Sequence, residues 1–239
     1  MVAALALVAA GCGKGGEPVE QVRVLQMSSP AVVPRADGAG TVVRVNASVA
    51  TAAAASPPVQ VPQVGSIAVG TPNGGKLVNG LQLPPRGLYW ATWDPILHSV
   101  PNRGYRRWGT DRLLAFLVGV LRDHHLANPA APPVLVGDLS RPLGGEFGRD
   151  YGGLGHASHQ NGLDVDVYYP RADGTLQAPE RPEEVDRTLA QDLVSRFVAW
   201  GAQFAFVGEH VGLGGPPAIV QPIAHHDDHV HIRIANARR

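Results

Sequence analysis

Six of the ten histidines in this 239-residue chain fall in two short windows that are far apart in the sequence. The first window, residues 156–166, holds two histidines and two aspartates, and the second, residues 225–231, reads His-His-Asp-Asp-His-Val-His. Core packing does not explain this concentration, because charged side chains are rarely buried without partners. Imidazoles and carboxylates gathered in this way are typical of a metal site. Any fold of this chain must therefore bring the two windows together.

Both windows run into segments that alternate between polar and apolar residues, which is the period of a β-strand. Residues 163–169 place Asp164, Asp166 and Tyr168 on one face and the apolar residues on the other. Residues 229–234 alternate in the same way, with His229, His231 and Arg233 on the polar face. If the two strands are neighbours, Asp166 and His231 converge on one side of the sheet.

This convergence predicts a zinc site. Zinc binds imidazole nitrogen and carboxylate oxygen, and a catalytic site keeps one position open for water. His159, in the loop before the first strand, would complete a set of two histidines and one aspartate with Asp166 and His231. His156, three residues earlier, is close enough to be a fourth ligand or a wall of the site. The imidazoles must be neutral to bind, so we expect metal affinity to fall below about pH 6.

The chain lacks the His-Glu-x-x-His helix that supplies a glutamate base in many metallopeptidases. His229 lies two residues from His231 on the same face, and His226 lies in the turn before it. Either could act as a general base or stabilise a developing oxyanion. The aspartates beside these residues are candidates to orient an imidazole from outside the ligand set: Asp164, Asp227 and Asp228.

The remaining pattern predicts an α+β fold, a small and mainly antiparallel sheet flanked by helices. A helix is expected within residues 108–128, where Thr110 can cap it, and a second over residues 182–200, which Gly201 stops. Further short strands are expected at residues 134–136, 204–207 and 219–221.

The N-terminal quarter of the chain has a different character. No Phe, Trp or Tyr precedes Tyr89, and residues 13–64 are rich in Ala, Val, Pro, Gly and Ser, so we expect a disordered, flexible linker. Residues 1–12 are apolar up to Cys12 and resemble the end of a bacterial lipoprotein signal peptide. A globular domain is expected over residues 65–239. A net charge of zero argues against a nucleic-acid binder.

Two sequence motifs together resemble the penicillin-insensitive murein endopeptidases, within the wider group of lysostaphin-like and D-Ala-D-Ala zinc peptidases. The motifs are Gly155-His-Ala-Ser-His-Gln-Asn-Gly-Leu-Asp-Val-Asp166 and His226-x-x-His229-x-His231-x-Arg233. The resemblance implies zinc ligands at His159, Asp166 and His231, with His156 as a fourth, and catalytic roles for His229 and His226. The second, ancillary metal site of well-known members has no counterpart here, so we expect one Zn²⁺ per domain.

The implied activity is hydrolysis of peptide cross-links in peptidoglycan by an exported protein. We expect it in the periplasm or cell envelope, with contact to a membrane only through a lipid anchor at Cys12. Two alternatives stay open. One is a D,D-carboxypeptidase or dipeptidase of the same superfamily, and the other is a non-catalytic lipoprotein that binds zinc or the cell wall. The sequence does not define the peptide bond that is cleaved or the oligomeric state.

Overall fold

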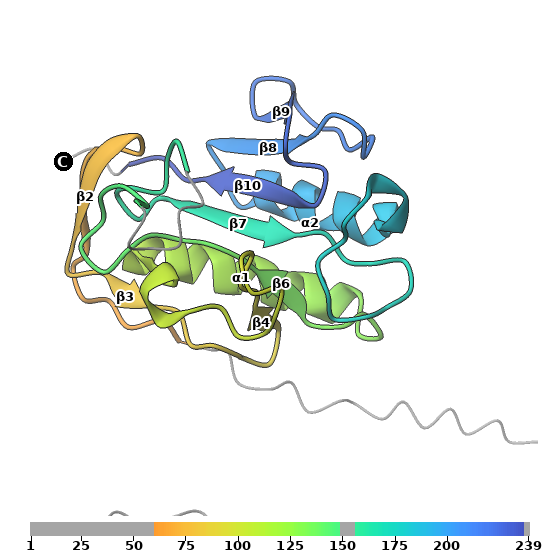
Figure 1. Ribbon diagram of the computed structural model, residues 1–239, viewed down its shortest axis with the longest axis horizontal. Helices are drawn as coiled ribbons and strands as arrows, with labels where there is room; N and C mark the ends of the chain where they lie inside the picture. The colour runs from red at the N-terminus through yellow and green to blue at the C-terminus, as the bar shows by residue number, and fades with distance from the viewer. Residues whose placement is uncertain (1–59, 149–155, 237–239) are drawn as a thin grey trace, which may run out of the picture. The chain divides into compact units, whose positions relative to one another are not determined.

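A six-stranded mixed sheet forms the centre of the domain in a computed structural model that describes residues 60–148 and 156–236 (Figure 1). Along the sheet the order is β4-β6-β7-β10-β8-β9. The three central pairings, from β6 to β8, are antiparallel, and the pairings of β4 with β6 and of β8 with β9 at the two edges are parallel. The strands are β4 (Trp90–Thr92), β6 (Val134–Val136), β7 (Asp164–Tyr168), β8 (Phe204–Gly208), β9 (Val220–Ile223) and β10 (His229–Arg233).

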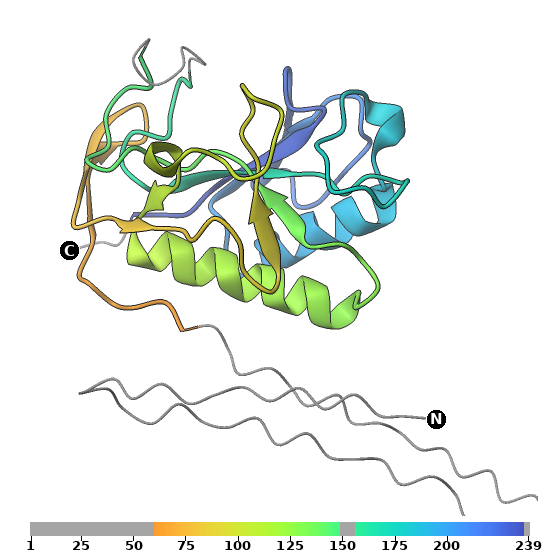
Figure 2. The same cartoon turned by 60° about the horizontal axis from the view of Figure 1, so that its bottom comes forward.

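Two helices, α1 (Asp111–Ala127) and α2 (Arg187–Ala199), pack against one face of this sheet (Figure 2). The Thr110 hydroxyl caps α1 by accepting a hydrogen bond from the Leu113 amide, as the sequence predicts. The α+β architecture expected from the sequence is therefore confirmed. No helix among the described residues is long and apolar enough to cross a membrane.

The helix-facing side of the sheet is the apolar core. Val165 and Val167 of β7 and Val230 and Ile232 of β10 have no exposed surface. Each buried aliphatic side chain of this size contributes about 1.5–3 kcal/mol to folding. Because side chains alternate along a strand, burying these four residues directs Asp164, Asp166, His229 and His231 to the opposite face.

Two smaller sheets complete the domain: β1 (Ile67–Thr71) with β2 (Gly74–Val78), and β3 (Leu81–Gln82) with β5 (Trp108–Gly109). The segment that leads into β1 is attached to α1 through one carboxylate. Asp111 Oδ2 accepts hydrogen bonds from the backbone amides of Val64, Gly65 and Ser66 at 2.9, 2.9 and 3.2 Å. These hydrogen bonds fix a segment at least 45 positions earlier in the chain to the N-terminus of α1.

The second helix begins later than the sequence predicts. Residues Pro182–Glu184 form a separate 3₁₀ turn (η3), Val185 is extended, and α2 starts only at Arg187. The reason is the Asp186 carboxylate, which accepts hydrogen bonds from the Thr188 and Leu189 amides and so caps a new helix. Val185, within the expected helix 182–200, is buried outside the helix instead.

Two expectations concern residues outside the described ranges. The signal-like segment 1–12 with Cys12 lies there, as does nearly all of the linker 13–64. The division into segments 1–12, 13–64 and 65–239 stays a prediction.

Candidate metal centre

The polar face of β7 and β10 brings the two histidine windows together. In the antiparallel pairing Asp166 lies opposite His231, and Tyr168 lies opposite His229. Asp166 is 4% exposed and His231 6%, although both carry polar side chains. The buried pair needs further polar partners, and the loop before β7 supplies them.

That loop is shaped to present His159. His159 has a left-handed backbone (φ 66°), and so does Gly162, three positions later (φ 76°). Gly162 packs closely against Leu77, and a Cβ added at Gly162 would lie 2.8 Å from the Leu77 side chain. Left-handed backbone in a residue other than glycine costs free energy and is common at functional sites. The result is a fully enclosed imidazole, 1% exposed, that reaches Asp166 and His231.

Hydrogen bonding fixes which nitrogen of His159 faces the cluster. Its Nδ1 lies 2.7 Å from the Leu139 carbonyl oxygen, which can only accept, so Nδ1 carries the proton and donates. The neutral ring then presents an unprotonated Nε2 to Asp166 and His231. Burial lowers the pKa of His159, which keeps the ring neutral.

Three candidate ligand atoms converge at this point. His159 Nε2 lies 3.1 Å from His231 Nδ1 and 3.3 Å from Asp166 Oδ1, and the last two atoms are 3.0 Å apart. Ligand atoms about 2.0–2.1 Å from a tetrahedral zinc ion are separated by about 3.3–3.4 Å, so the triangle is close to the size that zinc requires. His159 and Asp166, with His156, also form a group whose ligand atoms all lie within 4.8 Å of one another.

The Asp166 carboxylate gives an independent test of fit. Its Oδ1 atom is buried and has no hydrogen-bond partner among the described residues, although three imidazole nitrogens lie within 3.7 Å of it. Burial would raise the pKa of Asp166, but the surrounding imidazoles together outweigh burial and hold the pKa well below its usual value. A buried, ionised carboxylate oxygen without a hydrogen-bond donor is suited to binding a cation, so the residues fit a metal ion.

A second carboxylate supports His231 from behind. Asp164 Oδ1 is 3.3 Å from His231 Nε2, and the same carboxylate binds Arg233 Nε at 2.6 Å and the His159 amide at 3.0 Å. Burial would lower the pKa of His231, but Asp164 and Asp166 raise it to about 9. Metal binding would therefore displace a proton from His231. Arg233 is occupied by this internal ion pair.

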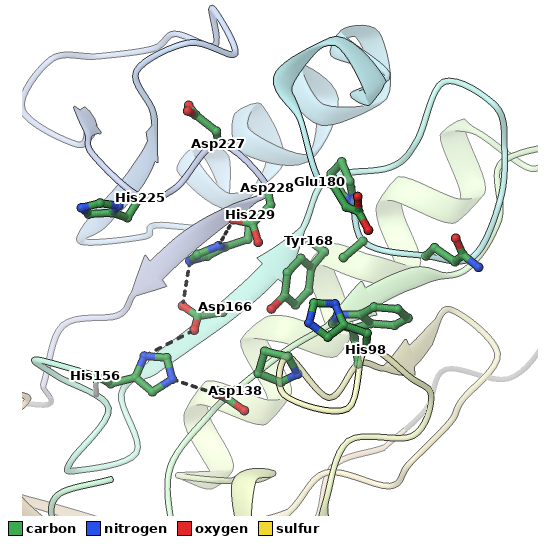
Figure 3. A pocket seen from close by; sticks show the side chains of 15 residues that line it. His98, Asp138, His156, Asp166, Tyr168, Glu180, His225, Asp227, Asp228 and His229 are labelled. Atoms are coloured by element: carbon green, nitrogen blue, oxygen red, sulfur yellow. Dashed lines mark hydrogen bonds and ion pairs between the residues drawn. The ribbon is translucent and has the colours of Figure 1, made fainter. Parts of the chain in front are cut away.

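His156 lies beside the cluster and is held by Asp138, a residue to which the sequence analysis assigned no role. Its Nε2 is 2.7 Å from Asp138 Oδ2, while its Nδ1 faces Asp166 Oδ2 at 3.8 Å (Figure 3). Asp138 is 1% exposed and also binds Arg106 and the Asn102 amide group. A carboxylate that accepts from one imidazole nitrogen and leaves the other turned to the cluster is the usual way to orient a metal-binding histidine.

His229 and His226 flank the cluster on its other side. His229 Nδ1 lies 2.6 Å from Asp228 Oδ1, and its Nε2 faces Asp166 Oδ1 at 3.7 Å. Burial would lower the pKa of His229, but Asp166 and Asp228 outweigh it and raise the pKa. The His226 ring centroid is 4.6 Å from that of His229, and burial lowers the pKa of His226.

Other candidates lie away from the centre. Asp227 pairs with His210 at 2.7 Å, so of the two neighbouring aspartates only Asp228 pairs with a cluster histidine. His225 is exposed and has no contact with the three ligand atoms. The roles of Asp138 and the Leu139 carbonyl were missed from sequence, although both residues come within three positions of the end of the buried strand β6. A carboxylate two residues beyond a buried strand is the signal that could have found Asp138.

Two clefts meet at the cluster. One, of about 760 Å³, is lined by Trp93, His98, Tyr168 and Glu180, and the other, of about 620 Å³, by Phe206, His226 and Arg233. Both are also lined by His156, Asp166 and His229. An extended ligand can therefore cross the cluster and occupy space on both sides.

The fold and this centre define a class of protein, an α+β protein with a candidate metal site in an open cleft. Residues 68–200, more than half of the chain, match the family model described as penicillin-insensitive murein endopeptidase, and the chain belongs to this family. The matched range contains His156, His159 and Asp166 and ends before β10, which carries His229 and His231.

Curated relatives carry the same family name. A penicillin-insensitive murein endopeptidase of Pectobacterium atrosepticum is 34% identical over 127 residues, which cover 52% of this chain and 42% of the relative. One from Escherichia coli is 37% identical over 94 residues, which cover 38% of this chain and 29% of the relative. The matched region thus spans less than half the length of these relatives.

Proposed function

We propose that this protein is an exported zinc metallopeptidase that hydrolyses peptide cross-links in peptidoglycan. The observation that carries the proposal is the convergence of His159 Nε2, His231 Nδ1 and Asp166 Oδ1 within 3.3 Å at the junction of two clefts. The names of the relatives support murein as the substrate class. The ligand set is His159, Asp166 and His231, with His156 as the fourth candidate.

When bound, zinc polarises a peptide carbonyl and lowers the pKa of the water beside it towards 7. The chain's own residues supply the proton transfer. Asp228 accepts a hydrogen bond from His229 Nδ1, which leaves Nε2 as the atom that takes a proton from the attacking water. The same atom can then return the proton to the leaving amine. His226, beside His229, is the second candidate for this role.

The two clefts favour cleavage inside a peptide over removal of a terminal residue. A carboxypeptidase needs space for only one residue beyond the scissile bond, whereas here the cluster has a cleft of several hundred Å³ on each side. This geometry supports an endopeptidase over the alternative D,D-carboxypeptidase or dipeptidase.

Digestion of isolated muropeptides, followed by mass spectrometry, tests the activity. We expect cross-linked dimers to disappear in the presence of zinc, in the wild-type protein and not in His229→Ala. Loss of terminal D-Ala from monomers with dimers intact would establish the carboxypeptidase instead. Zinc binding without hydrolysis of any muropeptide would establish the non-catalytic lipoprotein.

Localisation is a separate part of the proposal. The Cys12 motif supports export and acylation, after which a linker over residues 13–64 would connect the anchor to the catalytic domain. Fractionation of cells that express wild-type protein and Cys12→Ala tests this. We expect the wild-type protein in the membrane fraction of the envelope and the variant released from it. Equal partitioning of both would exclude the anchor.

A further inference from the structure

Tyr168 occupies a position in the cleft that the metal site does not explain. It is the last residue of β7, on the same face as Asp166 and directly opposite His229 in β10. Its ring centroid lies 5.6 Å from that of His229 and 6.3 Å from that of Trp93. The residue lines the larger cleft beside Asp138, His156 and Asp166, and Figure 3 shows its hydroxyl turned towards Asp166.

The Tyr168 hydroxyl has no hydrogen-bond partner in the part of the chain that the structure describes, residues 60–148 and 156–236. The residue as a whole is only 6% exposed. The hydroxyl oxygen itself is nevertheless not completely enclosed. The small exposed surface of Tyr168 opens into the cleft. Buried tyrosine hydroxyls usually have a partner. The Tyr168 hydroxyl is therefore open to whatever occupies the cleft, water in the free protein or a bound ligand.

The next residue shows the opposite arrangement. Tyr169 is 1% exposed and belongs to the apolar core on the helix side. Its hydroxyl accepts a hydrogen bond from the Gly208 amide at 3.3 Å. One of two adjacent tyrosines thus uses its hydroxyl to hold the fold, whereas the other leaves its hydroxyl to a ligand.

The chemistry of the surrounding side chains indicates what that ligand offers. Asp166 and Asp228 stand on the same side of the cleft and accept hydrogen bonds, whereas Tyr168 is a neutral donor beside them. A backbone carbonyl oxygen can only accept. Tyr168 is thus one of the neutral donors, with the indole of Trp93 and the amide of Gln177, that this cleft can offer to such an oxygen.

We propose that Tyr168 is a substrate-binding residue whose hydroxyl donates a hydrogen bond to a backbone carbonyl oxygen of the peptide on the Trp93 side of the metal centre. The inference rests on the proposed peptidase function. It assigns the larger cleft to one half of the substrate and makes Tyr168 a contact that the free protein does not use.

The test compares Tyr168→Phe with Tyr169→Phe, which remove the same atom from neighbouring positions. For Tyr168→Phe we expect unchanged zinc content, a melting temperature of the metal-free protein equal to or above that of wild type, and kcat/KM for a cross-linked muropeptide lower by roughly tenfold to a hundredfold. For Tyr169→Phe we expect a lower melting temperature and unchanged kcat/KM for the folded protein.

Wild-type kcat/KM in Tyr168→Phe would overturn the proposal, as would a loss of melting temperature equal to that of Tyr169→Phe. A wild-type protein that hydrolyses no muropeptide would instead overturn the proposed function. In that case, calorimetry with the same muropeptide tests Tyr168 separately. Weaker binding to Tyr168→Phe would support the contact, and equal binding would exclude it.

Discussion

Asp166 and His231 are 65 residues apart in the chain and directly opposite each other in the sheet, with Asp166 Oδ1 and His231 Nδ1 3.0 Å apart. A shift of one residue in the pairing of β7 and β10 would turn one of these side chains into the core. The apolar residues that alternate with the polar ones in β7 and β10 therefore determine the geometry of the site as much as the polar residues do. Burial of Val165, Val167, Val230 and Ile232 sets the register that joins the ligands.

Two substitutions in β10 separate metal binding from proton transfer. We expect His231→Ala to lose both zinc and activity, because it removes one corner of the ligand triangle. His229→Ala should keep zinc and lose activity by about a hundredfold or more, as is typical of general acid–base residues. Elemental analysis and muropeptide digestion on both variants check this. Full turnover by His229→Ala would show that another group carries the proton.

His156 should affect metal affinity without determining whether metal binds. It is oriented by Asp138, but its Nδ1 is 3.8 Å from Asp166 Oδ2, outside the tighter triangle. We expect His156→Ala to bind one zinc ion with about tenfold to a hundredfold weaker affinity. Competition with a zinc chelator measures the change. Affinity equal to that of wild type would make His156 a wall of the cleft only.

The Asp111 carboxylate should be important for stability. Asp111→Ala removes the acceptor of three backbone amides, and we expect the free energy of unfolding to fall by about 1–3 kcal/mol. Glu183→Ala, at an exposed acidic position, is the control and should change it by less than about 0.5 kcal/mol. Urea denaturation of both variants measures this. Equal stability of the two would mean that the attachment contributes nothing.

His124 should make the domain less stable in mild acid. Burial lowers the pKa of His124 below its usual value of 6.5, against the opposing effect of Asp192. The unfolded chain then binds a proton more readily than the folded one, so the contribution of His124 is complete above pH 6.5 and is lost as the pH falls through the lowered folded pKa. We expect a smaller loss of unfolding free energy between pH 7 and 5 in His124→Gln than in wild type. An identical pH dependence would contradict this.

Local patterns predicted those parts of the fold that depend on local chemistry. The alternation in residues 163–169 and 229–234 predicted two strands with a shared polar face, and Thr110 predicted the start of α1. The predicted start of α2 at Pro182 was wrong because the Asp186 side chain caps the helix, which therefore begins at Arg187. Pro182 and Asp186 are both possible helix starts in the sequence, and the burial of Val185 in the core distinguishes between them only in the folded structure.

The residues around the metal centre were less predictable. Asp138 meets His156, and the Leu139 carbonyl meets His159, across 18 and 20 positions of chain. Neither contact follows from a period or a motif, because each depends on where β6 lies beside β7. The alternation placed Tyr168 on the polar face, and it does contact Trp93 and His229 there, but the unpartnered state of its hydroxyl depends on its three-dimensional surroundings.

The proposed metal centre requires that His159, Asp166 and His231 bind one metal ion. Zinc content after equilibration and dialysis tests this in wild type, in His159→Ala, and in His98→Ala, which alters an exposed histidine of the same cleft. We predict about one zinc ion per chain in wild type and His98→Ala, and almost none in His159→Ala. Equal zinc in all three proteins, or none in wild type, would contradict the assignment.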